Sequence, residues 1–287
     1  MPVVSTNNAA NIALGYLNAA VLREQGQVGQ LASGSRIIQA SDDAAGLAIA
    51  GQLDASLGVS TQNKANIGQG SAILQSTDAG LAEISHILQR MMSLASEAAS
   101  GQVTDSQRSY DIGTEYNQLV SQISTIVAGT SYGGHSLLSG SFLDNVRYLV
   151  GTGTNGAITV NFSGVTGSSL GVATSTVGTE AAAERAMTTL SAAINTVGEK
   201  LAQIGAYESR FSFSNQVLAT NILDLSSAQS VIMDADVASV KAQLSATGVL
   251  VQSGVAALAQ AGQLPTNLLR MIQPSMTAGN SNGAAAA

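Results

Sequence analysis

The sequence predicts a mainly α-helical protein, built from long coiled-coil helices with one small β-hairpin. Over most of the chain, apolar residues recur at alternating steps of three and four, which is typical of coiled-coil seams. This period stops between residues 139 and 178, where β-branched residues and glycines predict the hairpin. Only 10% of the 287 residues are charged and 3% are aromatic. Because such a surface carries few charges, we expect much of it to be covered by other copies of the chain.

The first predicted helix spans residues 8–32. Ser33-Gly34-Ser35 ends it, because Gly has a low helix propensity and Ser favours caps and turns. We expect its seam to pack against a partner helix. The large apolar residues assigned to this seam are Leu14, Leu17, Val21, Val28 and Leu31.

A second helix is expected from Ala44 to Ser100. Asp42 and Asp43 precede it and supply negative charge and side-chain acceptors for the unpaired N–H groups at its start. Metal binding or acid chemistry is the alternative role for these aspartates. No histidine or third carboxylate lies near enough in sequence to complete such a site, so we interpret both as hinge and capping residues.

A third helix is expected to end near Gly129, after a break at residues 101–105. Beyond it, the β-rich segments 148–150 and 157–162 flank Asn155-Gly156, which predicts a type I′ turn. Residues 151–156 match the pattern GxGxxG, but a strand follows where dinucleotide binding requires a helix, so that function is excluded. The segment 164–178 is rich in Gly, Ser and Thr and is expected to be an exposed loop.

The last third of the chain returns to helix. One unbroken register runs from Met187 to Ile232, and Glu208 within it is interpreted as a polar contact that sets the register. A final helix is expected over 237–263. Asp234 and Asp236 precede it as hinge and cap, since this DxD pair lacks the other ligands of a calcium loop. The seam of this helix is expected to contain Leu244, Val251 and Leu258.

Several function classes are excluded by composition. A net charge of -7 and a pI near 4.7 argue against nucleic-acid binding. The chain has no Cys, and its two histidines, His86 and His135, do not have HExxH spacing. We therefore expect no enzyme activity, no cofactor and no metal. The amino terminus lacks the pattern of a signal peptide, and every apolar stretch is interrupted, so we expect no membrane insertion.

The segment Leu31 to Ala50 reads L-A-S-G-S-R-I-I-Q-A-S-D-D-A-A-G-L-A-I-A. It resembles the bacterial flagellin hallmark L-S-S-G-x-R-I-x-x-A-x-D-D-A-A-G-L-A-I-A. Four further stretches resemble flagellin motifs in the same order along the chain. They are Leu88-Gln-Arg-Met91, Ile204-Gly-Ala-Tyr-Glu-Ser-Arg-Phe211, Ile232-Met-Asp-Ala-Asp236 and Leu258-Ala-Gln-Ala-Gly-Gln-Leu-Pro265.

The resemblance implies a domain organisation. In flagellins the terminal helices pair as an inner antiparallel coiled coil, and the middle helices form an outer bundle with a β-hairpin. This assigns residues 1–36 and 236–272 to an inner coiled-coil domain, and 37–235 to an outer helical domain with its hairpin around 140–178. Only residues 139–178 lie where flagellins carry large outer domains, so a short form is expected. Residues 273–287 are expected to form a flexible tail.

The resemblance also implies a function and partners. Flagellins polymerise into the extracellular flagellar filament that drives motility. They leave the cell without a cleaved signal peptide, through the flagellar type III export machinery and its chaperone, and they meet filament cap and hook-junction proteins. A hook-filament junction protein, or a coiled-coil secretion or scaffold protein, is the alternative. We also expect residues up to about Ser35 and after about Asp236 to be disordered in the free monomer.

One candidate receptor surface follows from the same resemblance. Arg90, Leu94 and Glu115 match positions that face the receptor in flagellins detected by Toll-like receptor 5. Met92-Ser93 stands where receptor-active flagellins have Arg-Glu. The alternative, which we favour, is that this face packs subunit against subunit in the filament.

Overall fold

The computed structural model describes residues 7–140, 142–151 and 156–272, with only the helical backbone for 265–272. The chain divides into two compact units, a terminal unit of residues up to Gln52 and from Ser227 onward, and a central unit, Leu53–Ser226. Residues 273–287, the expected tail, lie outside the described residues. The mainly α fold class is confirmed. Its long helices are α1 (Asn8–Ser33), α2 (Ala44–Ala98), α4 (Gly113–Gly129), α5 (Glu180–Met233) and α6 (Val237–Ile272).

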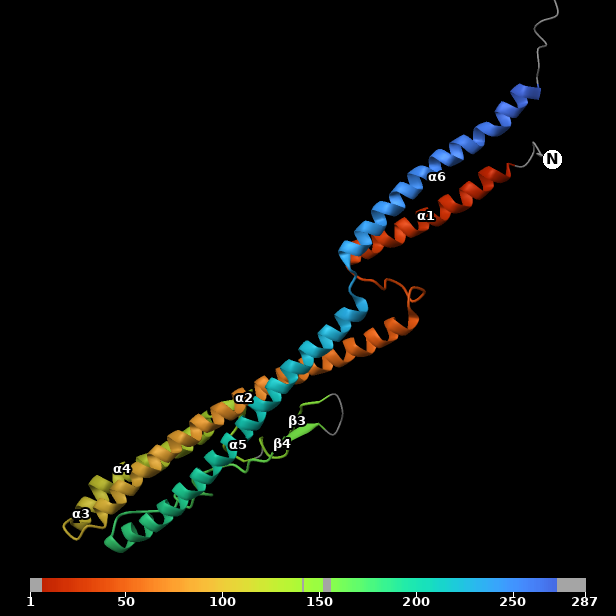
Figure 1. Cartoon of the computed structure of the whole chain (residues 1–287). Helices are drawn as coiled ribbons and strands as arrows, with labels where there is room; N and C mark the ends of the chain where they lie inside the picture. The colour runs from red at the N-terminus through yellow and green to blue at the C-terminus, as the bar shows by residue number, and fades with distance from the viewer. Residues whose placement is uncertain (1–6, 141, 152–155, 273–287) are drawn as a thin grey trace, which may run out of the picture. The chain divides into compact units, whose positions relative to one another are not determined.

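In the terminal unit, α1 and α6 lie side by side and run antiparallel (Figure 1). Near the start of α1, the side chain of Asn7 donates a hydrogen bond to the carbonyl of Ala261 at 2.7 Å. Further along the pair, the backbones approach closely at Gly254, where an added Cβ would lie 3.2 Å from Leu17 Cδ1. The final helix, α6, ends at Ile272, past its expected end at residue 263.

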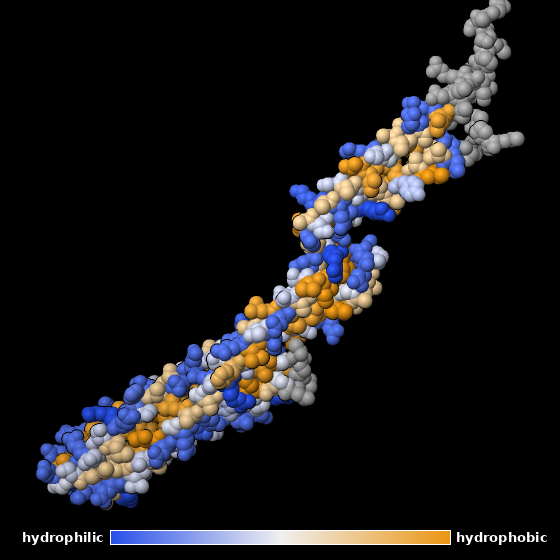
Figure 2. Space-filling model, in the orientation of Figure 1, coloured by the Kyte–Doolittle hydropathy of each residue, from blue (hydrophilic) through white to orange (hydrophobic). Residues whose placement is uncertain are grey.

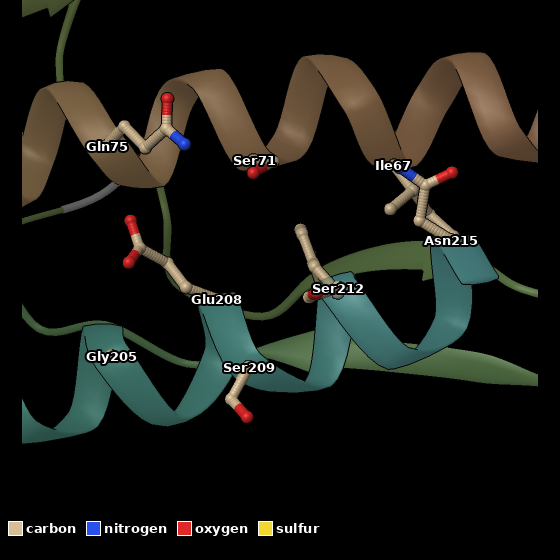
Figure 3. A pocket seen from close by; sticks show the side chains of 9 residues that line it. Ile67, Ser71, Gln75, Gly205, Glu208, Ser209, Ser212 and Asn215 are labelled. Atoms are coloured by element: carbon tan, nitrogen blue, oxygen red, sulfur yellow. The ribbon is translucent and has the colours of Figure 1, made fainter.

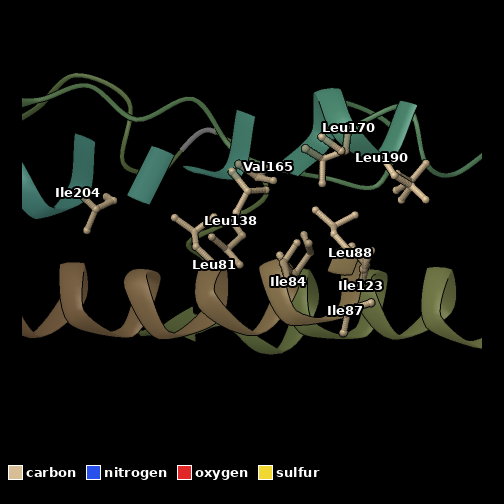
Figure 4. Packing of buried hydrophobic residues seen from close by; sticks show 14 of the residues in the cluster. Leu81, Ile84, Ile87, Leu88, Ile123, Leu138, Val165, Leu170, Leu190 and Ile204 are labelled. Carbon is tan, nitrogen blue, oxygen red and sulfur yellow. The ribbon is translucent and has the colours of Figure 1, made fainter. Parts of the chain in front are cut away.

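The central unit contains one hydrophobic core between α2, α4 and α5 (Figure 4). Large side chains fill it, and they follow the three-four spacing that the sequence predicts on each long helix. Phe211 packs edge-on against Tyr148, and Gly70 leaves room for both rings, since an added Cβ would lie under 3 Å from each. Other fully buried members are Leu74, Leu81, Ile84, Leu88, Met91, Ile123, Leu190, Val197 and Ile204.

The connection between α2 and α4 is a short α-helix, α3 (Asp105–Gln107), followed by a π-helical turn, η1 (Arg108–Ile112). Thr104 caps it, because its hydroxyl accepts from Gln107 N–H at 3.4 Å while the Gln107 side chain accepts from Thr104 N–H at 3.1 Å. The break expected at 101–105 is therefore present, and the cap fixes where the helix restarts.

Two small antiparallel strand pairs follow. β1 (Ser131–Tyr132) pairs with β2 (His135–Ser136) through two glycines with positive φ, and β3 (Val146–Leu149) pairs with β4 (Ala157–Val160). In the second pair Leu149 lies opposite Ala157, and Val150 N–H donates to Gly156 at 2.7 Å. The connection is thus longer than a two-residue turn, and the predicted type I′ turn at 155–156 is wrong. Residues 152–155, including most of the glycine pattern, lie outside the described residues.

The segment 164–178 is not the exposed loop that its composition suggests. Val165, Leu170, Val172 and Val177 are all buried in the core of the central unit. Gly, Ser and Thr dominate the composition of this segment, but the apolar residues between them pack into the core. The segment 164–178 therefore contributes to the core of the central unit.

One described helix is long and apolar enough, by length and composition alone, to cross a membrane. The stretch Val237–Leu264 of α6 has a mean hydropathy of 1.3. Gly, Ser and Gln interrupt this stretch as the sequence predicts, but it still meets the length and composition of a span, because Lys241 is its only charged residue. Little of this stretch is buried within the terminal unit.

Candidate assembly surface

The seam between α1 and α6 combines small residues with larger apolar and polar ones. On α1, the side of the helix that is half-buried or buried repeats at steps of three and four, as does the matching side of α6. Small side chains let the two backbones come close together, which is the arrangement seen at Gly254. The seam positions are Ala10, Ala13, Leu17, Ala20, Glu24, Gln27 and Leu31 on α1, and Val240, Leu244, Thr247, Val251, Gly254, Leu258 and Ala261 on α6.

Two residues predicted for this seam lie outside it. Leu14 is 44% exposed and Val28 is 50% exposed, whereas Leu17, Val21 and Leu31 are half-buried. The observed seam on α1 shares Leu17 and Leu31 with the predicted one. Elsewhere it is shifted by one residue toward the N-terminus, and it runs through Ala13, Ala20 and Gln27. The spacing is the predicted one but its phase differs, because the side of α1 that α6 covers decides which residues are buried. On α6, the predicted Leu244, Val251 and Leu258 are half-buried in the seam.

Several large apolar residues of α1 and α6 are turned to solvent. Figure 2 shows apolar side chains on the visible face of the α1–α6 pair. Exposed apolar side chains gathered on one pair of helices indicate a protein-protein contact. We call these residues the exposed apolar set, each at least 44% exposed: Ile12, Leu14, Leu22 and Val28 on α1, and Val249, Leu250, Val255 and Leu264 on α6.

At one end of the pair, the segment that follows α1 and the segment that precedes α6 are joined by backbone hydrogen bonds. Arg36 N–H donates to Met233 at 2.6 Å, and Ala235 N–H donates to Gly34 at 3.0 Å. Gly34 has φ +69°, a conformation that favours glycine, and ends α1. The Arg36 guanidinium also donates to the carbonyl of Ile232 at 2.8 Å. These bonds fix the register of the α1 end against the α6 start.

The four candidate hinge and cap aspartates divide into two kinds. Asp43 caps α2, accepting from Gly46 N–H at 2.8 Å, and Asp236 caps α6, accepting from Ala238 and Ser239 N–H at 3.0 and 3.1 Å. Asp42 instead binds back to the preceding turn. The N–H groups of Gln39 and Ile38 hold the pKa of its carboxyl below the usual value.

Asp234 does not cap α6 either. Its carboxylate accepts a hydrogen bond from the hydroxyl of Ser230, one turn earlier on α5. Among the described residues no group of three His, Cys, Asp or Glu side chains is placed to hold a metal ion. Asp43 and Asp236 are therefore helix caps, whereas Asp42 and Asp234 form local contacts with the preceding turn or helix.

The candidate receptor residues belong to the central unit. Arg90 and Glu115 form an ion pair between α2 and α4, with Nη2 2.6 Å from Oε1, and both side chains are about half exposed. Leu94 is only 3% exposed and lies in the hydrophobic core. It is therefore buried in the central unit and does not share the exposed surface of Arg90 and Glu115.

Sequence reasoning missed one buried cation. Arg108 lies in η1, where its Nε donates to the carbonyl of Ala98 at 2.5 Å and its Nη2 to that of Ser100 at 2.7 Å. Its Nη1 also pairs with Asp105 at 2.8 Å. Arg108 thereby satisfies carbonyl groups at the end of α2, where the helix dipole is negative. The sequence signal that could have identified Arg108 is its position, directly after a predicted helix break.

Taken together, the fold and the exposed apolar set define a coiled-coil protein whose two ends pair with each other and leave apolar side chains for association. Two protein-family models match the chain, the bacterial flagellin N-terminal helical region over residues 4–142 and the bacterial flagellin C-terminal helical region over residues 187–272. The chain belongs to the bacterial flagellin family.

Individual relatives agree with this assignment. The flagellar filament 30.7 kDa core protein of Treponema maltophilum is 30% identical over 277 residues, covering 92% of this chain and 96% of the relative. A flagellin of Halalkalibacterium halodurans is 30% identical over 262 residues, covering 90% and 96%. A solved protein of Vibrio parahaemolyticus, provisionally described as flagellar hook-associated, is 17% identical with a TM-score of 0.55, covering 67% of this chain and 99% of that one. This last likeness concerns the fold alone.

Proposed function

We propose that this flagellin is a structural subunit that polymerises with copies of itself into the flagellar filament, through its terminal unit. The observation that carries the proposal is the exposed apolar set on α1 and α6. Each large apolar side chain removed from water contributes about 1.5–3 kcal/mol, so repeated contacts provide the driving force for assembly. Contacts between different faces of identical subunits do not close on themselves, and they extend into a helical polymer.

Within the polymer, we assign residues 1–36 and 236–272 to the inner coiled coil and residues 37–235 to the outer helical layer. This assignment is supported by the two kinds of packing. The central unit has a core of large, fully buried residues, whereas the α1–α6 seam leaves its leucines only half-buried and the pair exposes further apolar residues. The role is structural and requires no catalysis or cofactor.

A single substitution tests the assembly proposal. Leu22→Glu places a charge in the exposed apolar set without touching the α1–α6 seam, and we expect it to abolish filaments while the monomer stays folded. Gln25→Glu adds the same charge at an exposed α1 position outside that set, and should leave filaments intact. Electron microscopy of sheared cell-surface fractions measures the outcome.

Two results would contradict the proposal. Normal filaments from Leu22→Glu would show that the exposed apolar set is not the contact surface. Immunogold label confined to the boundary between hook and filament would favour the hook-filament junction alternative.

The proposal extends to export and location. Family membership supports an extracellular protein that leaves the cell unfolded, through the flagellar type III machinery and its chaperone, and is inserted beneath the filament cap next to the hook-junction proteins. Mass spectrometry of the filament protein should give the mass of the uncleaved chain. A shorter mass, or normal secretion from a strain without flagellar export, would contradict it.

For the Arg90–Glu115 pair, we favour packing against a neighbouring subunit over receptor binding. The supporting facts are the burial of Leu94 and the Met92-Ser93 sequence beside it. We expect the purified monomer to stimulate Toll-like receptor 5 reporter cells only weakly. Potency equal to that of a receptor-active flagellin would overturn this assignment.

A further inference from the structure

A cavity of about 450 Å³ lies between α2 and α5 inside the central unit, one side of it open to solvent. Figure 3 shows that the side chains around it are mostly polar and come from both helices. The Glu208 carboxylate reaches from α5 toward Gln75 of α2, and Ser71 and Ser212 lie beside the space between them. The cavity is large enough for an ion together with several water molecules.

Glu208 is the one charged residue in the lining of this cavity, and its negative charge lacks compensation. Its Oε1 atom is buried, and no described residue forms a hydrogen bond with it. Within the described parts of the chain, Glu208 forms no salt bridge. Burial, and then the nearby charge of Asp78 on α2, raise the pKa of its carboxyl. A desolvated carboxylate beside a second one is stabilised by a positive charge placed near both.

The other polar groups around the cavity are neutral oxygen donors. Gln75 and Asn215 offer carboxamide oxygens, and Ser71 and Ser212 offer hydroxyls. Hard cations prefer such oxygen ligands. Among them, Ca²⁺ tolerates irregular geometry and mixed ligands, while Mg²⁺ demands a near-ideal octahedron and retains its water.

We propose that this cavity binds one hydrated hard cation, with Ca²⁺ the best fit, held directly by the Glu208 carboxylate and attracted by the charge of Asp78. Two carboxylates and a few neutral oxygens make a weak site, with a Kd on the order of 10⁻⁴–10⁻³ M, as in extracellular Ca²⁺ modules. Bound between α2 and α5, the ion joins the two long helices at a point where the core is interrupted. The site lies wholly within the central unit and does not depend on polymerisation.

Thermal unfolding of the full-length monomer tests this, followed by circular dichroism at pH 7.5 after chelation. Adding CaCl₂ to about ten times the Kd should raise Tm by about 3–6 °C for a unit of this size. NaCl at matched ionic strength should not. Glu208→Gln should abolish the response, and Asp78→Asn should weaken Ca²⁺ binding by about three- to tenfold through the lost charge.

Glu199→Gln is the matched control, since it removes one exposed carboxylate from the same helix outside the cavity and should keep the full response. An equal Tm rise in Glu208→Gln, or in NaCl alone, would overturn the proposal. So would a chain that gains stability at pH 5 but shows no Ca²⁺ response, because a proton would then be the group that completes the site. If Glu208→Gln does not fold, the weakened response of Asp78→Asn decides the question.

Discussion

The central and terminal units are both made of antiparallel helices with three-four apolar spacing, but they bury different side chains. In the central unit the fully buried residues are large, among them Tyr116, Phe162, Phe211 and Leu88. In the terminal unit the most buried residues of the α1–α6 seam are smaller, such as Ala20, Ala261 and Thr247, and several large apolar residues face solvent. The same periodicity thus gives a private core in one region and an external contact surface in the other.

This difference has an energetic consequence. A fully buried Leu or Phe contributes about 1.5–3 kcal/mol, and the central unit contains many of them. The α1–α6 pair leaves the leucines of its seam only half-buried and gains far less, and helices are marginal in water without partners. We therefore expect the central unit to be stable as a monomer and the terminal unit to gain its stability by association.

The largest expected effect is in hydrogen exchange of the free monomer. Amides of α2 and α5 within the central unit should exchange only through global unfolding. Those of α1 and α6 should exchange through local opening that costs at least about 4 kcal/mol less, or roughly 10³-fold faster. Mass spectrometry at high dilution measures this. Equal protection in both units would contradict the comparison, and also the expectation that the chain ends are disordered in the monomer.

Next in size is a pair of Leu→Ala substitutions. Leu88→Ala, in the core of the central unit, should lower the free energy of unfolding of the monomer by about 2–5 kcal/mol. Leu258→Ala, half-buried in the α1–α6 seam, should cost less than about 1 kcal/mol in the monomer but reduce filament yield. Urea unfolding followed by circular dichroism gives both values. Similar losses for the two variants would show that the terminal unit has a core of its own.

A smaller effect separates two arginines of the central unit. Arg108→Ala leaves the carbonyls of Ala98 and Ser100 without their buried donor and should cost about 2–3 kcal/mol. Arg90→Ala removes an exposed ion pair and should cost about 0–1 kcal/mol. Their Tm values, measured side by side, check the ranking. The reverse order would mean that the exposed pair, and not the buried cap, stabilises α2.

The smallest expected effect is the pH dependence that Glu208 gives to the stability of the central unit. The folded state raises the pKa of Glu208, so its protonated form is favoured by folding. The stability this contributes is present below the unfolded carboxyl pKa and is lost as pH rises through the folded value. Glu208→Gln should therefore be more stable than the parent chain at pH 7, with the difference shrinking toward pH 4. Tm values in the presence of a chelator measure this, with Glu199→Gln as control, and a difference independent of pH would refute it.

Much of this architecture is encoded locally. The helix breaks at Ser33-Gly34 and Thr104 follow from propensity and capping, and the heptad spacing placed the long helices correctly, because these signals act over a few residues. The ordered motifs that identify the flagellin family also lie in the sequence itself. The sequence alone therefore determined the long helices and the family, although α6 runs on to Ile272, past its expected end.

Only the tertiary structure decided which side of each helix is buried. The α1 seam runs through Ala13, Ala20 and Gln27 and leaves out Leu14 and Val28, because α6 covers a side of the helix that the spacing alone does not specify. Leu94 and the segment 164–178 became core, and Glu208 kept an unpaired oxygen, through contacts with residues far along the chain. Helical periodicity fixes the direction of each side chain around its own axis. Which side of the helix is buried depends on where the neighbouring helix packs.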